Sequence, residues 1–168
     1  LPNAESEGEI QVLSVDGKGV PVIKKEADKL KARLGKGEKR QKKKEALVGV
    51  SYTIASKKRT PEQVAENLVF PEKARKKKLD DDKEAVTPVR AENVRRMASL
   101  ERPKKEVVEE IFRDAERRDP AHKRQWVVVM DGALHLWDLV ALVLSGIDYT
   151  GVLDIIHVVE YLWLQYGH

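Results

Sequence analysis

Cysteine is absent from this chain of 168 residues, which excludes disulfide bonds and thiolate metal sites. A reducing, intracellular setting agrees with that absence. Long uncharged runs are also missing. In the apolar C-terminal third the longest, residues 139–147, has nine residues, whereas a membrane-spanning helix needs roughly 20. With 41% apolar residues the chain can bury one core, so the composition indicates a single domain and argues against membrane insertion.

Lysine and arginine are missing from residues 125–168, which contain five acidic residues. By contrast, residues 24–44 hold eleven Lys or Arg against three acids, and residues 73–78 hold five basic residues in six. The net charge of +4 therefore hides a strong segregation of charge. It predicts a basic surface for a polyanion beside an acid-tipped core. The alternative is that the Lys-rich runs are solvated loops.

The first half of the chain has the apolar pattern of strands. Residues 10–15 predict a buried strand, and residues 20–23 predict its hairpin partner, because Gly17 and Gly19 permit a turn between them. Residues 45–55 are rich in β-branched and aromatic residues, typical of a third strand. A charged helix is expected over 24–44. Three antiparallel strands are therefore expected to open the fold.

Helix signals dominate the second half. Thr60 is followed by Pro-Glu-Gln, a capping box that predicts a helix to about residue 69. After an expected loop, with a short strand allowed over 95–101, a second helix is expected over 104–117. Residues 125–132 and 150–157 are expected to be buried strands on either side of a helix closed by Gly146. That order implies a right-handed parallel crossover, so the predicted fold is α/β with a mixed sheet.

Two aspartates, Asp16 and Asp131, each follow an apolar strand and precede a glycine. In open α/β sheets functional groups gather at strand ends, so the two are expected to lie together. Two such charges repel by about 4 kcal/mol at 4 Å and an effective dielectric near 20. A bound Mg²⁺ or Mn²⁺ would remove that repulsion, and the chemistry suited to it is phosphodiester cleavage or transfer. The alternative is that each Asp-Gly pair is only a turn.

Several segments in order, "VLSVDGKGVPV", "GEKRQKKKEALVGVSYTI", "RTPEQVAENL", "ERRDPAHKRQWVVVMDG" and "LDIIHVVEYLW", resemble bacterial insertion-sequence transposases of the ISKra group. The resemblance extends from about residue 7 to 163. It implies a ribonuclease H-like catalytic domain of the DDE type, a mixed sheet with a basic insertion, whose first two metal-binding acids are Asp16 and Asp131. It also implies the helix at 104–117 before strand four, and leaves residues 60–100 as an insertion.

The third acid departs from the family pattern. The resemblance implies a catalytic Glu on a later helix, so we expect residues 1–168 to be part of a longer catalytic domain and, alone, to lack that residue. Glu160, on the helix after strand five, is the second candidate. Asp154 and His157 also fit the family motif and could approach the metal site or a DNA phosphate. Their alternative roles are orientation and helix capping. Trp126, Trp137 and Trp163 are expected to fill core or interface space.

The expected partner is DNA, both element ends and target, with self-association of the full-length protein in the bacterial cytoplasm at the nucleoid. No zinc finger or clear helix-turn-helix is present, so an end-binding domain is expected outside these residues. A ribonuclease H-like nuclease or resolvase, and a non-catalytic basic nucleic-acid-binding module, are the alternative functions. The residues expected to contact the DNA backbone are Lys18, Lys36, Lys39, Arg40, Lys42, Lys43, Lys44, Arg75, Lys76, Lys77 and Lys78.

Overall fold

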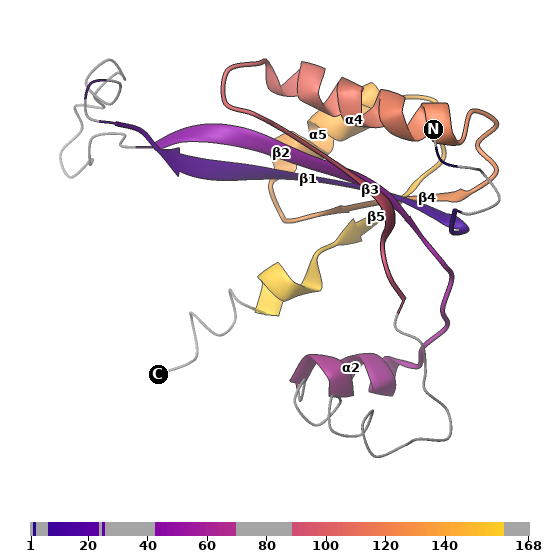
Figure 1. The fold of residues 1–168 in the computed structure, drawn as a ribbon. Helices are drawn as coiled ribbons and strands as arrows, with labels where there is room; N and C mark the ends of the chain where they lie inside the picture. Colours follow the sequence, from indigo (N-terminus) through magenta and orange to yellow (C-terminus); the bar gives the residue numbers. More distant parts are fainter. Residues whose placement is uncertain (1, 3–6, 24, 26–42, 70–88, 160–168) are drawn as a thin grey trace.

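A five-stranded sheet is the centre of the computed structural model, which describes residues 2, 7–23, 25, 43–69 and 89–159 (Figure 1). The strand order is β3-β2-β1-β4-β5. The pairs β1–β2 and β2–β3 are antiparallel, and the pairs β1–β4 and β4–β5 are parallel. The expected mixed α/β sheet is therefore confirmed. The elements are β1 (Ile10–Pro21), β2 (Lys43–Ile54), α2 (Pro61–Val69), β3 (Glu92–Ser99), α4 (Lys104–Arg118), β4 (Gln125–Met130), α5 (Leu134–Val143) and β5 (Thr150–Leu153).

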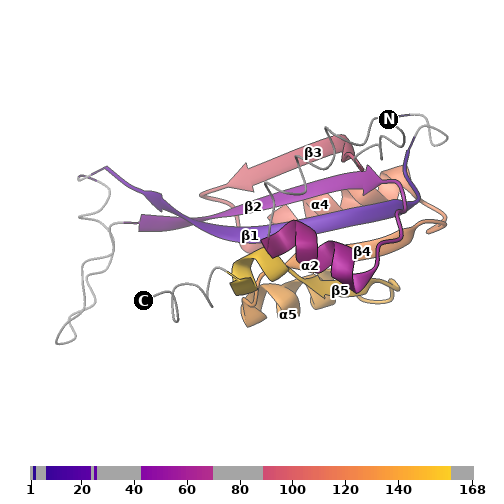
Figure 2. The same cartoon turned by 90° about the horizontal axis from the view of Figure 1, so that it is seen from below.

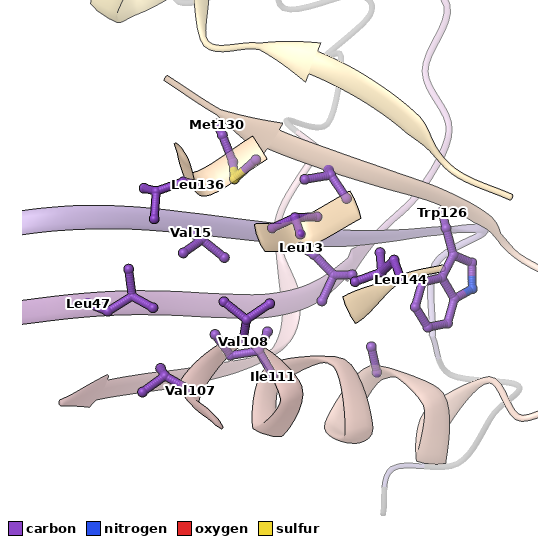
Figure 3. Packing of buried hydrophobic residues seen from close by; sticks show 13 residues of the cluster. Leu13, Val15, Leu47, Val107, Val108, Ile111, Trp126, Met130, Leu136 and Leu144 are labelled. Carbon is purple, nitrogen blue, oxygen red and sulfur yellow. The ribbon is translucent and has the colours of Figure 1, made fainter. Parts of the chain in front are cut away.

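The core lies between the sheet and helices α4 and α5, which share one face (Figures 1 and 3). Strand alternation turns Leu13 and Val15 toward these helices, where they join one buried apolar cluster with Val108 and Ile111 of α4. Gly49 of β2 lets α4 come close, since a Cβ there would lie 1.7 Å from Ile111 Cδ1. Helix α2 lies on the other side of the sheet, and its residues 61–66 are exposed (Figure 2).

The expected turn at Gly17 and Gly19 is wrong, because β1 continues through both glycines to Pro21. β2 pairs with β1 along its whole length, from Ile10↔Ile54 to Pro21↔Lys43, so the ladder leaves no room for a turn. Residues 18–21 and 43–46 pair only with each other and extend from the sheet as a two-stranded arm (Figures 1 and 2). The third antiparallel strand is instead β3, which overlaps the short strand allowed at 95–101 over residues 95–99 and belongs to the sheet rather than to an insertion over 60–100.

Two strands expected to be buried on both faces are not. In β4, buried and less buried residues alternate, because only one face of the sheet carries α4 and α5. All four residues of β5 are exposed, since it is the edge strand, and the strand expected over 150–157 is wrong beyond Leu153, because residues 155–157 are helical. The charged helix expected over 24–44 is wrong at residues 43 and 44, which belong to β2, and residues 24 and 26–42 lie outside the described residues.

The helices expected after Thr60, over 104–117 and before Gly146 are confirmed. The Thr60 amide donates to Gln63 Oε1 at 3.1 Å and the Gln63 amide donates to Thr60 Oγ1 at 3.3 Å, which is the predicted capping box at the start of α2. Helix α4 ends at Arg118, two residues before Pro120, and α5 ends at Val143, followed by a turn that contains Gly146 with a φ of 85°. No helix within the described ranges is both long and apolar enough to span a membrane.

A buried charged cluster closes the end of the sheet where β1 and β4 begin. Arg118 Nη2 donates to Glu7 Oε1 at 2.5 Å, and both side chains are 1% exposed. Arg124 Nη2 lies 3.5 Å from Glu7 Oε2 and its Nη1 lies 3.7 Å from Asp119 Oδ1. Trp126, as expected a core residue, donates its indole N–H to Asp119 Oδ2 at 2.9 Å. These contacts join the segment before β1 to the end of α4.

Candidate functional site

Asp16 and Asp131 occupy equivalent positions on neighbouring parallel strands. The last paired residues of β1 and β4 are Ser14 and Val129, and each aspartate lies two residues further along its chain. Neighbouring strands are about 4.8 Å apart, so this register brings the two residues side by side. Because Val15 faces the core, alternation turns Asp16 toward the opposite face, and Asp131 directly follows Met130, the last residue of β4.

Asp16 lies inside a strand rather than at its end. β1 continues into the arm, whereas its neighbour β4 ends at Met130, so the aspartate stands at the base of the arm where the sheet narrows. Its side chain is 42% exposed, and its one ion pair within the described residues is with Lys18, whose Nζ lies 3.9 Å from Asp16 Oδ2. A solvent-exposed pair at that distance contributes little to stability and leaves the carboxylate accessible to a ligand.

Asp131 begins the connection from β4 to α5. Its Oδ1 accepts a hydrogen bond from the Ala133 amide at 3.1 Å, which is the turn that the alternative interpretation expected. Its backbone oxygen accepts the indole N–H of Trp137 at 2.8 Å. Neither contact uses Asp131 Oδ2, and within the described residues that oxygen accepts no hydrogen bond. A turn role and a ligand role are therefore compatible.

Asp154 directly follows β5 and lies next in the same row. Met130 at the end of β4 pairs with Leu153 at the end of β5, and Asp131 and Asp154 are the residues that follow them. The Asp154 amide donates a hydrogen bond to the Met130 carbonyl oxygen at 2.8 Å. Its carboxylate, however, caps the following turn: Oδ1 accepts the Ile156 amide at 2.9 Å and Oδ2 lies 3.1 Å from His157 Nδ1. The contacts favour the capping and orientation role for Asp154 and His157. Glu160 and Trp163 lie outside the described residues.

Tyr52 is a residue of this face that sequence reasoning missed. It pairs with Val12 on β1 and alternates with Ser51 and Thr53, which are buried toward the helices. Burial, and secondly the negative charge of Asp154, raise the pKa of the Tyr52 phenol. Strand alternation therefore puts Tyr52 on the face that bears Asp16, and Asp154 lies near enough to Tyr52 to act on its charge. The signal that could have found Tyr52 is the strand alternation in "ALVGVSYTI".

Replacing Asp154 with Asn is expected to lower the pKa of Tyr52. An anionic neighbour disfavours the phenolate, so removing its charge lets the phenol ionise at lower pH. The pKa should stay above its ordinary value, because burial, the larger cause, is unchanged. An NMR titration of the Tyr52 ring measures this, with Asp148→Asn, at an exposed acid, as the control. An identical Tyr52 titration in wild type and Asp154→Asn would contradict the effect of Asp154 on Tyr52.

The basic residues predicted to contact DNA are only partly described. Lys18 is 73% exposed and lies on the arm beyond Asp16, where it can reach a phosphate. Lys43 is exposed on the other strand of the arm. Lys44 instead forms an ion pair, its Nζ 2.6 Å from Glu101 Oε1, which reduces its availability. Outside the described residues lie Lys36, Lys39, Arg40, Lys42, Arg75, Lys76, Lys77 and Lys78.

Asp16 and Asp131 could supply two ligands to a hard cation, but they do not form a complete metal site by themselves. In the part of the chain that the structure describes, no three His, Cys, Asp or Glu side chains form a group that could hold a metal ion. Mg²⁺ commonly binds through one or two carboxylates and completes its shell with waters and substrate phosphates. Asp16 and Asp131 offer two oxygen-donor side chains of that kind. The donor chemistry therefore fits Mg²⁺ or Mn²⁺ held jointly with a phosphate.

The chain matches no protein-family model, no curated protein and no solved structure. The transposase resemblance of the sequence motifs therefore stays a prediction. The function is inferred from the chemistry of Asp16, Asp131 and Tyr52.

Proposed function

We propose that this chain is part of the catalytic domain of a DDE transposase, with a ribonuclease H-like sheet, that cuts and joins DNA at the ends of an insertion sequence. The observation that carries the proposal is the matched position of Asp16 and Asp131 on neighbouring parallel strands. The strand order, three antiparallel strands followed by two parallel ones, supports it because the resemblance implies that arrangement.

The charges around the pair are consistent with a phosphodiester substrate. Two carboxylates alone would repel DNA, so a cation and basic side chains are needed beside them. Lys18 lies on the same strand two residues beyond Asp16 and is exposed, in position to contact a backbone phosphate. The arm that carries Lys18 and Lys43 leads into the segment 24–42, which is rich in Lys and Arg. Polyanion binding of this kind supplies affinity without sequence recognition.

In the proposed reaction Asp16 and Asp131 would hold Mg²⁺ or Mn²⁺ with their carboxylate oxygens. The bound ion would lower the pKa of a water and stabilise the attacking and leaving oxygens. In the first step the water oxygen bonds to phosphorus and the bond to the 3′ oxygen breaks, which leaves a 3′-hydroxyl. In the second step that hydroxyl attacks a target phosphate and displaces its 3′ oxygen. A function on DNA would place the protein at the bacterial nucleoid, with self-association to pair two ends.

The test is a cleavage and joining assay on DNA that carries the ends of the element. With Mg²⁺ we expect nicking at the ends and, when pre-cut ends are supplied, a joined product; a chelator should abolish both. Cleavage without joining would favour the nuclease or resolvase. Salt-sensitive binding without either reaction would favour the non-catalytic nucleic-acid-binding module and contradict the proposal.

A further inference from the structure

Trp137 connects helix α5 to the backbone of Asp131. It lies in the first turn of α5, and its indole Nε1 donates to the Asp131 carbonyl oxygen at 2.8 Å. The ring is half-buried against the core and lies close to β5, since a Cβ added to Gly151 would be 3.1 Å from Trp137 Cζ3. The indole is thus fixed on both sides and points its one N–H at a single residue.

Asp131 depends on such contacts because it follows the last residue of β4. The peptide unit before it is fixed by the Asp154 amide, which donates to Met130 O at 2.8 Å. The Asp131 carbonyl, which belongs to the next peptide unit, is fixed by Trp137. With both units held, the bond from the Ala133 amide to Asp131 Oδ1, at 3.1 Å, sets the direction of the carboxylate. Trp137 supplies the contact on the helix side.

We infer that Trp137 is a positioning residue that holds the Asp131 carboxylate in place to bind a divalent cation beside Asp16. The inference rests on the proposed function, because it needs Asp131 to be a metal ligand. The inference assigns a role to a residue that would contact neither the metal nor the DNA. Groups that orient a ligand in this way commonly change metal affinity by 10- to 100-fold when they are replaced.

The test replaces Trp137 with Phe, which keeps a ring beside Gly151 and removes the indole N–H. The dissociation constant for Mn²⁺ alone, measured by electron paramagnetic resonance on the whole protein, is expected to rise about tenfold. Hydrogen exchange of the Ala133 amide should become faster. The matched control is Trp126→Phe, which also loses an indole hydrogen bond, to Asp119 Oδ2 at the other end of the sheet. Its Mn²⁺ affinity should equal that of the wild type.

Three results would overturn the inference while leaving the proposed function intact. One is an unchanged Mn²⁺ affinity in Trp137→Phe; another is an equal loss in both tryptophan variants, which would show only a general loss of stability. The third uses the wild-type protein, so it does not depend on a variant that folds. Because linkage is reciprocal, bound Mg²⁺ is expected to slow hydrogen exchange of the Trp137 indole proton. If Mg²⁺ leaves that exchange rate unchanged, Trp137 is not coupled to the metal site. Failure of the proposed function is distinct. If Asp131→Asn binds Mn²⁺ as tightly as the wild type does, Asp131 is not a metal ligand. The proposed function then fails, and the inference about Trp137 fails with it.

Discussion

Replacing either Asp16 or Asp131 with Asn is expected to slow Mg²⁺-dependent DNA cleavage about a thousandfold. The amide keeps the size of the side chain but removes the negative charge that holds the cation, and metal ions contribute several kcal/mol to phosphoryl chemistry. A loss of about 4 kcal/mol corresponds to three factors of ten in rate. Single-turnover cleavage of DNA that carries the ends of the element measures the effect. Both variants should lose cleavage and joining together, because the two steps use the same pair of acids.

The matched control for this prediction is Asp138→Asn. Asp138 is an exposed acid on α5, so the same chemical change there should leave the cleavage rate at the wild-type value. Circular dichroism of all three variants checks that they fold. Wild-type cleavage by Asp16→Asn or by Asp131→Asn would show that the acid in question is not a metal ligand. The proposal of a shared cation site would then have to be abandoned.

Glu7→Gln is expected to lower the free energy of unfolding by about 3 kcal/mol, the lower end of the range for breaking a buried ion pair. Glu7 and Arg118 are each 1% exposed, and Arg124 also lies beside the carboxylate. Without its charge, two buried guanidinium groups lose an anionic partner that water cannot replace. Asp114 and Asp119 remain close to the two arginines, at 3.8 and 3.7 Å, which keeps the loss at the lower end. Urea denaturation at neutral pH measures it.

Glu101→Gln is the control for Glu7→Gln, since it makes the same substitution in an exposed pair. Glu101 is 78% exposed and its partner Lys44 is 36% exposed, so the loss there should be about 0–1 kcal/mol. The dependence of the unfolding free energy on urea should be unchanged in both variants if neither alters the surface exposed on unfolding. Equal losses in the two variants would contradict a special role for the cluster around Glu7.

The site could be predicted only as far as local patterns reach. Asp16 and Asp131 were identifiable because each follows an apolar run and precedes Gly, but the interpretation of Gly17 as a turn was wrong. Glycine permits a turn without requiring one, and pairing with β2 decided the matter. The hydrogen bond from Trp137 to Asp131 could not be predicted, because it depends on how α5 packs against the sheet.

The contribution of Glu7 to stability could not be predicted from the sequence either. In the sequence it is one acid among many near the N-terminus, and nothing local separates it from exposed glutamates. Its burial depends on Arg118 and Arg124, more than a hundred residues away along the chain. Such a contact has no periodicity to detect.

The sequence by itself determined the helices α2, α4 and α5, the existence of a mixed sheet and the segregation of basic from acidic residues. Capping residues and apolar periodicity act within a few residues, and these decide where helices begin and which face is apolar. Only the tertiary structure decided which strands pair, that β5 lies exposed at the edge, that Asp16 and Tyr52 share one face, and that Asp131 follows the strand beside Asp16. Strand pairing joins residues far apart in the chain, so its register depends on the packing of the whole sheet.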